Sequence, residues 1–132
     1  MTIPRKLKKL EIVFSKYIRL RDARNSLGGS DFARCCTCGE VSHITNLQAG
    51  HFIPGRRGTG KAAFDERNCH AQCSLCNYND KDVEYFHYMQ STYSMEVIKE
   101  LRDMSKDMSF SYTRSWLDEM TAHYKAKLKE LE

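Results

Sequence analysis

The chain has 132 residues, of which 41% are hydrophobic and 29% charged, and this composition is typical of one ordinary globular domain. No apolar run reaches the roughly 20 residues that a membrane helix needs, and no signal peptide is visible, which argues against a membrane or secreted protein. We therefore expect a cytosolic protein that has no membrane partner. In that compartment the six cysteines are more readily metal ligands or free thiols than disulfides.

The net charge of +4 is unevenly distributed along the chain. Residues 1–77 carry 13 Lys and Arg against 6 Asp and Glu, whereas residues 78–132 carry 8 against 11. A basic front half suggests a surface that faces a polyanion such as DNA.

Residues 5–25 are predicted to form a helix, with Pro4 in its first turn and the segment 26–29 at its end. Its apolar residues recur at helical spacing: Leu7, Leu10, Phe14, Tyr17 and Ile18. The opposite face carries cations that include Arg19 and Arg21. This face is either simply solvated or in contact with a DNA backbone, and the sequence leaves both interpretations open.

Residues 41–45 and 47–53 are two short β-rich runs, which we expect to pair as a hairpin that places His51 near the end of its second strand. The segment 54–61 that follows is a loop by composition, with three glycines and the cations Arg56, Arg57 and Lys61. It lacks the spacing of a P-loop. It is either a mobile loop or a loop that contacts DNA beside an active site.

The last third of the sequence is predicted to be helical. Asp80 is the expected cap of a helix that runs to about residue 90 and buries Val83 and Phe86, with Tyr85 or Met89 as further candidates. Ser94 should cap the next helix, and Ser111 or Thr113 should open the last one. The apolar stripes of these helices are expected to form core or a seam with a partner helix.

Four cysteines have the spacing of a structural zinc site. Cys35 and Cys38 form one C-x-x-C pair, Cys73 and Cys76 form another, and 34 residues separate the two pairs. Such pairs can supply the four thiolates of a tetrahedral Zn²⁺ site, which has no open position and does no chemistry itself. Cys36 should then be a spectator and Cys69 a small buried hydrophobe.

His51, Asn68 and Asn77 are the candidate residues for phosphodiester hydrolysis. His51 could act as the general base, since its unperturbed pKa lies near the working pH; the alternative is a structural histidine or an extra zinc ligand. The carbonyl oxygen of Asn77 suits a hard cation such as Mg²⁺ or Mn²⁺, and the alternative for this residue is a helix cap. Asn68 would brace the intervening loop through side-chain-to-backbone hydrogen bonds, and so fix the direction of His51.

The order of these three residues, with Asn77 nine positions after Asn68, resembles that of HNH (His-Me finger) nucleases. More closely, the chain resembles the NinG (Rap) recombination proteins of lambda-like bacteriophages, with a shorter amino end than typical members. The resemblance covers most of the chain, and the pieces that match are Tyr17–Asp22, Cys35–Gly39, Ala49–His51, Asn68–Asn77 and Tyr124–Lys129. The resemblance implies an endonuclease that acts on branched recombination intermediates such as Holliday junctions and D-loops, in the cytoplasm of a bacterial host.

Gly50 departs from the pattern of many HNH enzymes, which have a metal ligand directly before the base. The second protein ligand is therefore left open. Of the candidates, His70 has the best claim because it lies inside the matched motif, although a structural hydrogen bond would explain it equally well. The other candidates are Gln48, His43, Asp80 and His87.

We therefore expect an α+β fold, with a small zinc-stapled ββα-metal core at 31–92 between an amino-terminal helix at 1–30 and carboxy-terminal helices at 93–132. The expected function is metal-dependent cleavage of branched DNA, and a homodimer would suit a symmetrical junction. The sequence leaves two alternative functions open. One is a non-catalytic zinc module that binds DNA or recruits phage or host recombination proteins, and the other is a sequence-selective HNH nuclease.

Overall fold

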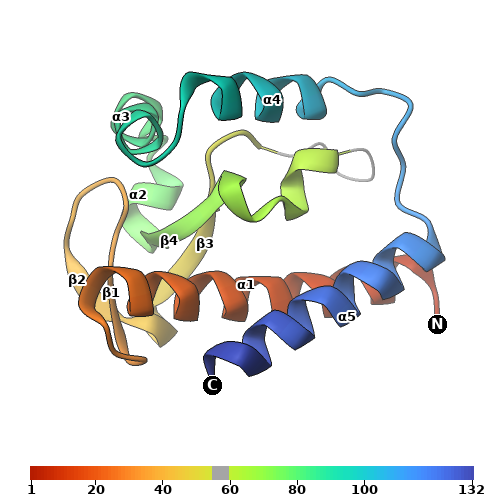
Figure 1. Cartoon of the computed structure of the whole chain (residues 1–132), viewed down its shortest axis with the longest axis horizontal. Coiled ribbons are helices and arrows are strands. Elements are labelled where there is room, and N and C mark those ends of the chain that lie inside the picture. Colours follow the sequence, from red (N-terminus) through yellow and green to blue (C-terminus); the bar gives the residue numbers. More distant parts are fainter. Residues whose placement is uncertain (55–59) are drawn as a thin grey trace.

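The computed structural model describes residues 1–54 and 60–132, and the fold is of the α+β class that the sequence predicts (Figure 1). Its elements, in chain order, are α1 (Ile3–Leu27), β1 (Phe32–Arg34), β2 (Val41–His43), η1 (Ile44–Asn46), β3 (Leu47–His51), η2 (Lys61–Phe64), η3 (Glu66–Asn68), β4 (Cys69–Cys73), α2 (Ser74–Tyr78), α3 (Asp82–Thr92), α4 (Met95–Ser105) and α5 (Arg114–Leu131). None of the helices in the described residues combines the length and the apolar character needed to cross a bilayer.

Helix α1 contains the predicted segment and is slightly longer at both ends. The Thr2 hydroxyl accepts a hydrogen bond from the Arg5 amide and caps the amino end. Gly28 ends the helix in the left-handed conformation, with φ at +80°, and its amide bonds back to two carbonyls of the last turn.

The largest core cluster lies between α1 and α5, which run in parallel, side by side (Figure 1). Their first turns are joined by a 2.5 Å ion pair between Lys6 and Asp118, and further along the ring centroids of Tyr17 and Tyr124 are 5.5 Å apart. Near the last turns, Arg24 donates a hydrogen bond to a carbonyl of α5. The buried residues between the helices include Leu10, Phe14, Ile18, Leu117 and Leu128.

The strands form two antiparallel pairs, and the hairpin predicted for residues 41–53 is wrong. Strand β1 pairs with β2, and β3 pairs with β4 so that His51 lies opposite Cys69. The chain turns between the two predicted strands because His43 Nδ1 accepts the Thr45 amide at 3.2 Å and Arg19 donates to the Ile44 carbonyl at 2.8 Å. Each strand therefore pairs with a segment outside the predicted hairpin.

Strand β4 is hydrogen-bonded on both edges. On the edge away from β3, the Asp22 carboxylate accepts the Ala71 amide at 2.6 Å, and Arg21 donates to the Cys69 carbonyl at 2.6 Å. The Cys36 amide donates to the Ala71 carbonyl at 2.9 Å. Helix α1 and the turn that holds the first cysteine pair therefore satisfy the backbone groups on this edge of β4. In a larger sheet a third strand would bond these groups.

Two details of α3 differ from the prediction. Asp80 does not cap the helix, because its backbone lies in the left-handed region with φ at +52° and the helix begins after Lys81. Val83, expected in the core, is 67% exposed, whereas Tyr85 and Met89, the further candidates, are both buried.

The starts of the last two helices agree with the prediction. The hydroxyls of Ser94 and Thr113 each accept the amide three residues later, and so cap α4 and α5. The buried residues of these helices, Ile98, Leu101, Leu117, Tyr124 and Leu128, belong to the expected apolar stripes.

Candidate functional site

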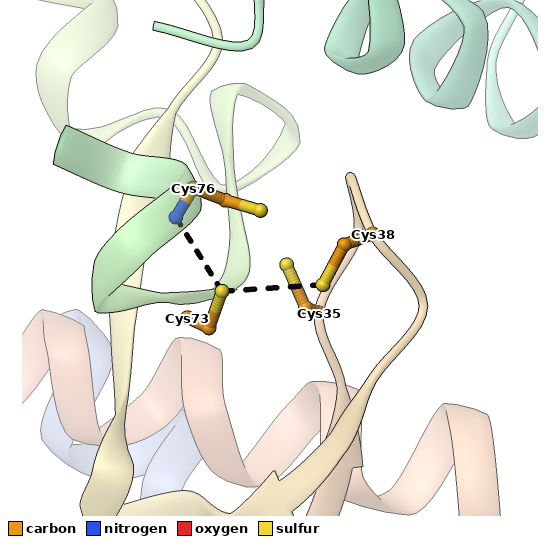
Figure 2. Close-up of side chains that lie close together, drawn as sticks. All are labelled: Cys35, Cys38, Cys73 and Cys76. Atoms are coloured by element: carbon orange, nitrogen blue, oxygen red, sulfur yellow. Dashed lines mark hydrogen bonds between the residues drawn. The ribbon is translucent and has the colours of Figure 1, made fainter. Parts of the chain in front are cut away.

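The four predicted zinc ligands lie together (Figure 2). The Sγ atoms of Cys35, Cys38, Cys73 and Cys76 are all within 4.8 Å of one another, and those of Cys38 and Cys73 are 4.0 Å apart. A tetrahedral zinc with Zn–S bonds of about 2.3 Å separates its sulfurs by roughly 3.8 Å. The cluster therefore fits a Cys₄ zinc ion after small side-chain adjustments.

Local backbone structure positions these thiols. The turn that holds Cys35 and Cys38 closes through a 2.9 Å bond from the Gly39 amide to the Cys35 carbonyl, and Gly39 has φ at +78°. Cys73 ends β4 and caps α2, because its Sγ accepts the Cys76 amide at 3.4 Å. The two C-x-x-C pairs are thus carried by a strand–turn and a strand–helix junction.

The other two cysteines are not part of the cluster. Burial raises the pKa of the Cys36 and Cys69 thiols, which keeps them protonated. Burial also opposes ionisation of Cys35, but hydrogen bonds from Thr37 and from backbone groups outweigh it and lower the pKa of Cys35 to about 6. Cys36 and Cys69 are therefore spectators, as the spacing predicts.

A cavity of about 1200 Å³ opens beside the zinc cluster. It brings together side chains from α1, β3, β4 and the segment around α2. Its polar lining includes Lys8, Glu11, Gln48, His51, Gln72, Asn77, Asp80 and Lys81. Two of the three residues predicted to carry the chemistry, His51 and Asn77, therefore share one cavity.

His51 is held in one tautomer. Its Nε2 lies 2.8 Å from the Ala63 carbonyl, which can only accept, so Nε2 carries the proton and Nδ1 is left as the basic nitrogen. Burial lowers the pKa of His51, although the Ala63 bond and the charge of Glu11 act in the opposite direction. The ring is therefore neutral at pH 7 and can accept a proton.

Asn68 makes the brace that was expected of it. Its side chain is fully buried, its Oδ1 accepts the Ile53 amide at 2.9 Å, and its Nδ2 donates to the carbonyls of Ile53 at 2.8 Å and Ala62 at 3.1 Å. The Asn68 carbonyl also accepts the Phe52 amide. These bonds fix the chain on either side of the His51–Ala63 contact, so Asn68 is a positioning residue.

Asn77 lies on the short helix α2, directly after the last zinc ligand. Its Nδ2 donates to Gln48 Oε1 at 2.6 Å. In the described part of the chain its Oδ1 has no hydrogen bond, which leaves this oxygen available to a cation in the cavity.

His70 is not placed to bind a metal beside His51, and the expectation that it does is corrected. Tyr85 gives its only proton to the Gly50 carbonyl at 2.6 Å, so His70 Nδ1 must donate to Tyr85 Oη at 3.1 Å. Its Nε2 then accepts from the Tyr93 hydroxyl at 2.9 Å. Burial, assisted by the charge of Arg21, lowers the pKa of His70 to about 3. Both nitrogens are occupied by tyrosine hydroxyls, and His70 is not among the residues that line the cavity.

The remaining ligand candidates divide into two groups. Gln48 and Asp80 line the cavity. His43, on β2, bonds to Thr45, and His87 is exposed on α3, and neither residue belongs to the lining. Gln48 and Asp80 are therefore the candidates that the structure brings next to Asn77.

The predicted DNA-contacting cations have different surroundings. Arg21 is withdrawn as a DNA contact, because its side chain is 12% exposed and donates to the Glu66 and Cys69 carbonyls. Arg19 likewise donates to backbone carbonyls. Lys61 lies on η2, 3.9 Å from the Asp107 carboxylate. Arg56 and Arg57 lie outside the described residues.

Sequence reasoning missed the contribution of α1 to the cavity. Lys8, Glu11 and Ser15 all line it. Their recurrence at helical spacing was a readable signal, but the sequence does not show that this stripe faces His51. Lys8 and Lys81 are the described cations of the lining, and neither was predicted.

Comparison with known proteins agrees with the resemblance found in the sequence. A sequence model of the family described as Bacteriophage Lambda NinG protein matches residues 5–132. Searches of curated proteins and of solved structures found no match. The matched region spans nearly the whole chain, from α1 through both cysteine pairs and the cavity to α5. The chain belongs to the bacteriophage lambda NinG family.

Proposed function

We propose that this protein is a divalent-metal-dependent endonuclease of the HNH type that cleaves branched DNA during phage recombination. The observation that carries the proposal is the state of His51. Its Nε2 is fixed by the Ala63 carbonyl, its pKa is lowered, and it shares a cavity with Asn77. A neutral, oriented imidazole in the same cavity as an oxygen that is free to bind a cation can supply the base and a metal ligand for hydrolysis of a phosphodiester.

In this proposal His51 Nδ1 takes the proton of the attacking water, while the Ala63 contact keeps the other nitrogen protonated and the ring fixed. The donor set of the cavity fits a hard cation, since the Asn77 and Gln48 carboxamides and the Asp80 carboxylate offer oxygen. A bound Mg²⁺ or Mn²⁺ would neutralise charge on the phosphate and stabilise the departing 3′-oxygen. Lys8 and Lys81 could contact phosphates, and a bound divalent cation would offset the negative charge of Glu11, Asp80 and Asp82, which also line the cavity.

The order of the elements around the cavity supports the HNH assignment. Strands β3 and β4 pair antiparallel, and α2 follows β4 without a break. His51 lies at the end of β3 and Asn77 on α2, so a β-β-α unit carries both. In this reading the Cys₄ zinc is purely structural and clamps the start of α2 to the turn after β1.

Branched DNA is the proposed substrate because NinG membership connects the chain with phage recombination. Resolution of a four-way junction needs two cuts related by symmetry, which a homodimer would supply.

The test is cleavage of a labelled four-way junction beside a matched linear duplex, in Mg²⁺ or Mn²⁺. We expect the wild type to cut the junction, His51→Ala to lose cutting while it keeps zinc and fold, and the exposed control His87→Ala to retain it. Because burial lowers the pKa of His51, the fall in cleavage on the acid side should have its midpoint below about pH 6.5. Equal cutting by His51→Ala would refute the assigned base.

A second candidate function is a non-catalytic zinc module that binds branched DNA. The observation in its favour is Gly50, which offers no side chain to a cation directly before His51. Tight junction binding without cutting in any metal would establish this alternative. Cutting of linear duplex at a preferred sequence would instead point to a sequence-selective HNH nuclease.

A further inference from the structure

We propose that Gln72 supplies an oxygen ligand to the divalent metal beside His51, in the space that Gly50 leaves open. The inference rests on the proposed function, since it names a ligand of that site. Gln72 lies on β4, directly opposite Gln48 of β3, and both side chains line the His51 cavity.

The Gln72 side chain is buried, but only the nitrogen of its carboxamide has a hydrogen-bond partner in the described part of the chain. The side chain is only 3% exposed, and its Nε2 donates to Thr37 Oγ1 at 3.2 Å. Its Oε1 accepts no hydrogen bond from any residue that the structure describes. In the described part of the chain no fully buried side-chain oxygen lacks a partner, so this oxygen keeps some exposed surface, and Gln72 lines the cavity. A carboxamide oxygen that is accessible and has no protein donor is suited to a cation.

Gly50 is explained by this carboxamide. A Cβ built on Gly50 would lie 1.9 Å from Gln72 Oε1 and 2.9 Å from Gln72 Cδ. The backbone of Gly50 does not have a positive φ, so its conformation does not call for glycine. The need is for space: residue 50 must lack a side chain so that the Gln72 oxygen can lie over the backbone next to His51.

The neighbouring donors complete the site. Asn77 Nδ2 is bonded to Gln48 Oε1 at 2.6 Å, and Asp80 lies on the same cavity wall. The Asn77 and Gln72 oxygens are both left without a donor from the described residues, and both residues line one cavity. Two neutral carbonyl oxygens with a nearby carboxylate form a set that suits Mg²⁺ or Mn²⁺.

The zinc cluster orients Gln72. Thr37, which receives the Gln72 amide, lies between the first two zinc ligands, and its Oγ1 is 3.3 Å from Cys35 Sγ. The same side chain therefore contacts the zinc turn through its nitrogen, while its oxygen lies over Gly50 and the residue lines the cavity. This contact is a physical route by which the structural metal positions a ligand of the second one.

The test is Mn²⁺ binding to the zinc-loaded full chain, measured by electron paramagnetic resonance without DNA. Gln72→Met keeps the length of the side chain but removes the oxygen, and should weaken Mn²⁺ binding about tenfold or more. Gly50→Ala should weaken it similarly, because the new Cβ displaces the carboxamide. Gln72→Glu restores an oxygen with added charge and should bind Mn²⁺ at least as tightly as the wild type. Gln90→Ala, on the exposed face of α3, is the control and should bind normally.

The outcomes separate the two proposals. Mn²⁺ binding that is normal in the wild type and unchanged in a folded, zinc-loaded Gln72→Met protein would overturn the ligand assignment while leaving the nuclease proposal in place. No Mn²⁺ binding by the wild type would overturn both. Should Gln72→Met not fold, Gln72→Glu decides, since weakened binding in that variant contradicts an oxygen ligand at residue 72.

Discussion

Replacement of Asn68 by alanine should destabilise the protein by about 3 kcal/mol. The side chain is 0% exposed and makes three hydrogen bonds, to the amide and carbonyl of Ile53 and to the carbonyl of Ala62. Each such bond contributes about 1 kcal/mol, and its loss leaves a backbone group unpaired. With a urea dependence of about 2 kcal/mol/M, the unfolding midpoint should fall by roughly 1.5 M.

The assay is urea unfolding of the zinc-loaded protein, followed by the fluorescence of Trp116, the only tryptophan in the sequence. Asn25→Ala on the exposed end of α1 is the matched control and should leave the midpoint nearly unchanged. Junction cleavage by Asn68→Ala should fall as well, even in conditions where the variant is folded, because Ala62 and Ile53 flank the contact that orients His51.

Asn68→Asp separates the two halves of the brace. It keeps an oxygen for the Ile53 amide but cannot donate to the two carbonyls, and its charge would face them, so it should be at least as destabilising as alanine. An unfolding midpoint of either variant equal to that of Asn25→Ala would refute the reasoning, since the brace would then contribute nothing to stability.

Two further predictions concern the zinc cluster and His70. Cys38 is exposed, so the substitution Cys38→Ser removes no core packing, but the variant should bind no zinc and be less stable. Cys69 is fully buried, and the Cys69→Ala variant should still hold one zinc per chain by mass spectrometry. Equal zinc content in the two variants would contradict the ligand set. The folded-state pKa of His70 is about 3, below the unfolded value near 6.5, so the unfolded chain binds a proton first as the pH falls. The free energy of unfolding should therefore decrease by about 1.4 kcal/mol per pH unit below 6.5. Urea titrations at several pH values should show a weaker pH dependence of this free energy for His70→Gln than for the wild type. An equal pH dependence in the two proteins would contradict the assignment of this effect to His70.

The zinc ligands could be predicted from sequence because their chemistry is local. Each C-x-x-C pair closes its own turn, so two-residue spacing alone separated Cys35 and Cys38 from Cys36. The helix caps Ser94 and Thr113 were readable for the same reason, since a cap bonds an amide three residues away. His51 and Asn77 were found through motif order, which the cavity then brings together.

The wrong predictions concern partners that are distant in sequence. Residues 41–53 have the composition of a hairpin, but the strands that complete each pair lie at 32–34 and 69–73. His70 falls inside the motif, yet its side chain alternates to the face where Tyr85 and Tyr93 provide hydroxyls. The role of Gln72 depends on a gap at Gly50 across the sheet, which no linear pattern displays.

The hydrogen bonds from α1 to β4 also bear on how the protein avoids aggregation. A two-stranded sheet has two free edges, and an edge with unpaired amides and carbonyls can recruit a strand from another molecule. Here Asp22 and Arg21 occupy the outer edge of β4 with a carboxylate and a guanidinium, groups that no incoming strand can extend. Neutralising Asp22 would therefore expose the strand that carries Gln72 and Cys73 to intermolecular pairing, and the first sign of that damage would be oligomers rather than lost zinc.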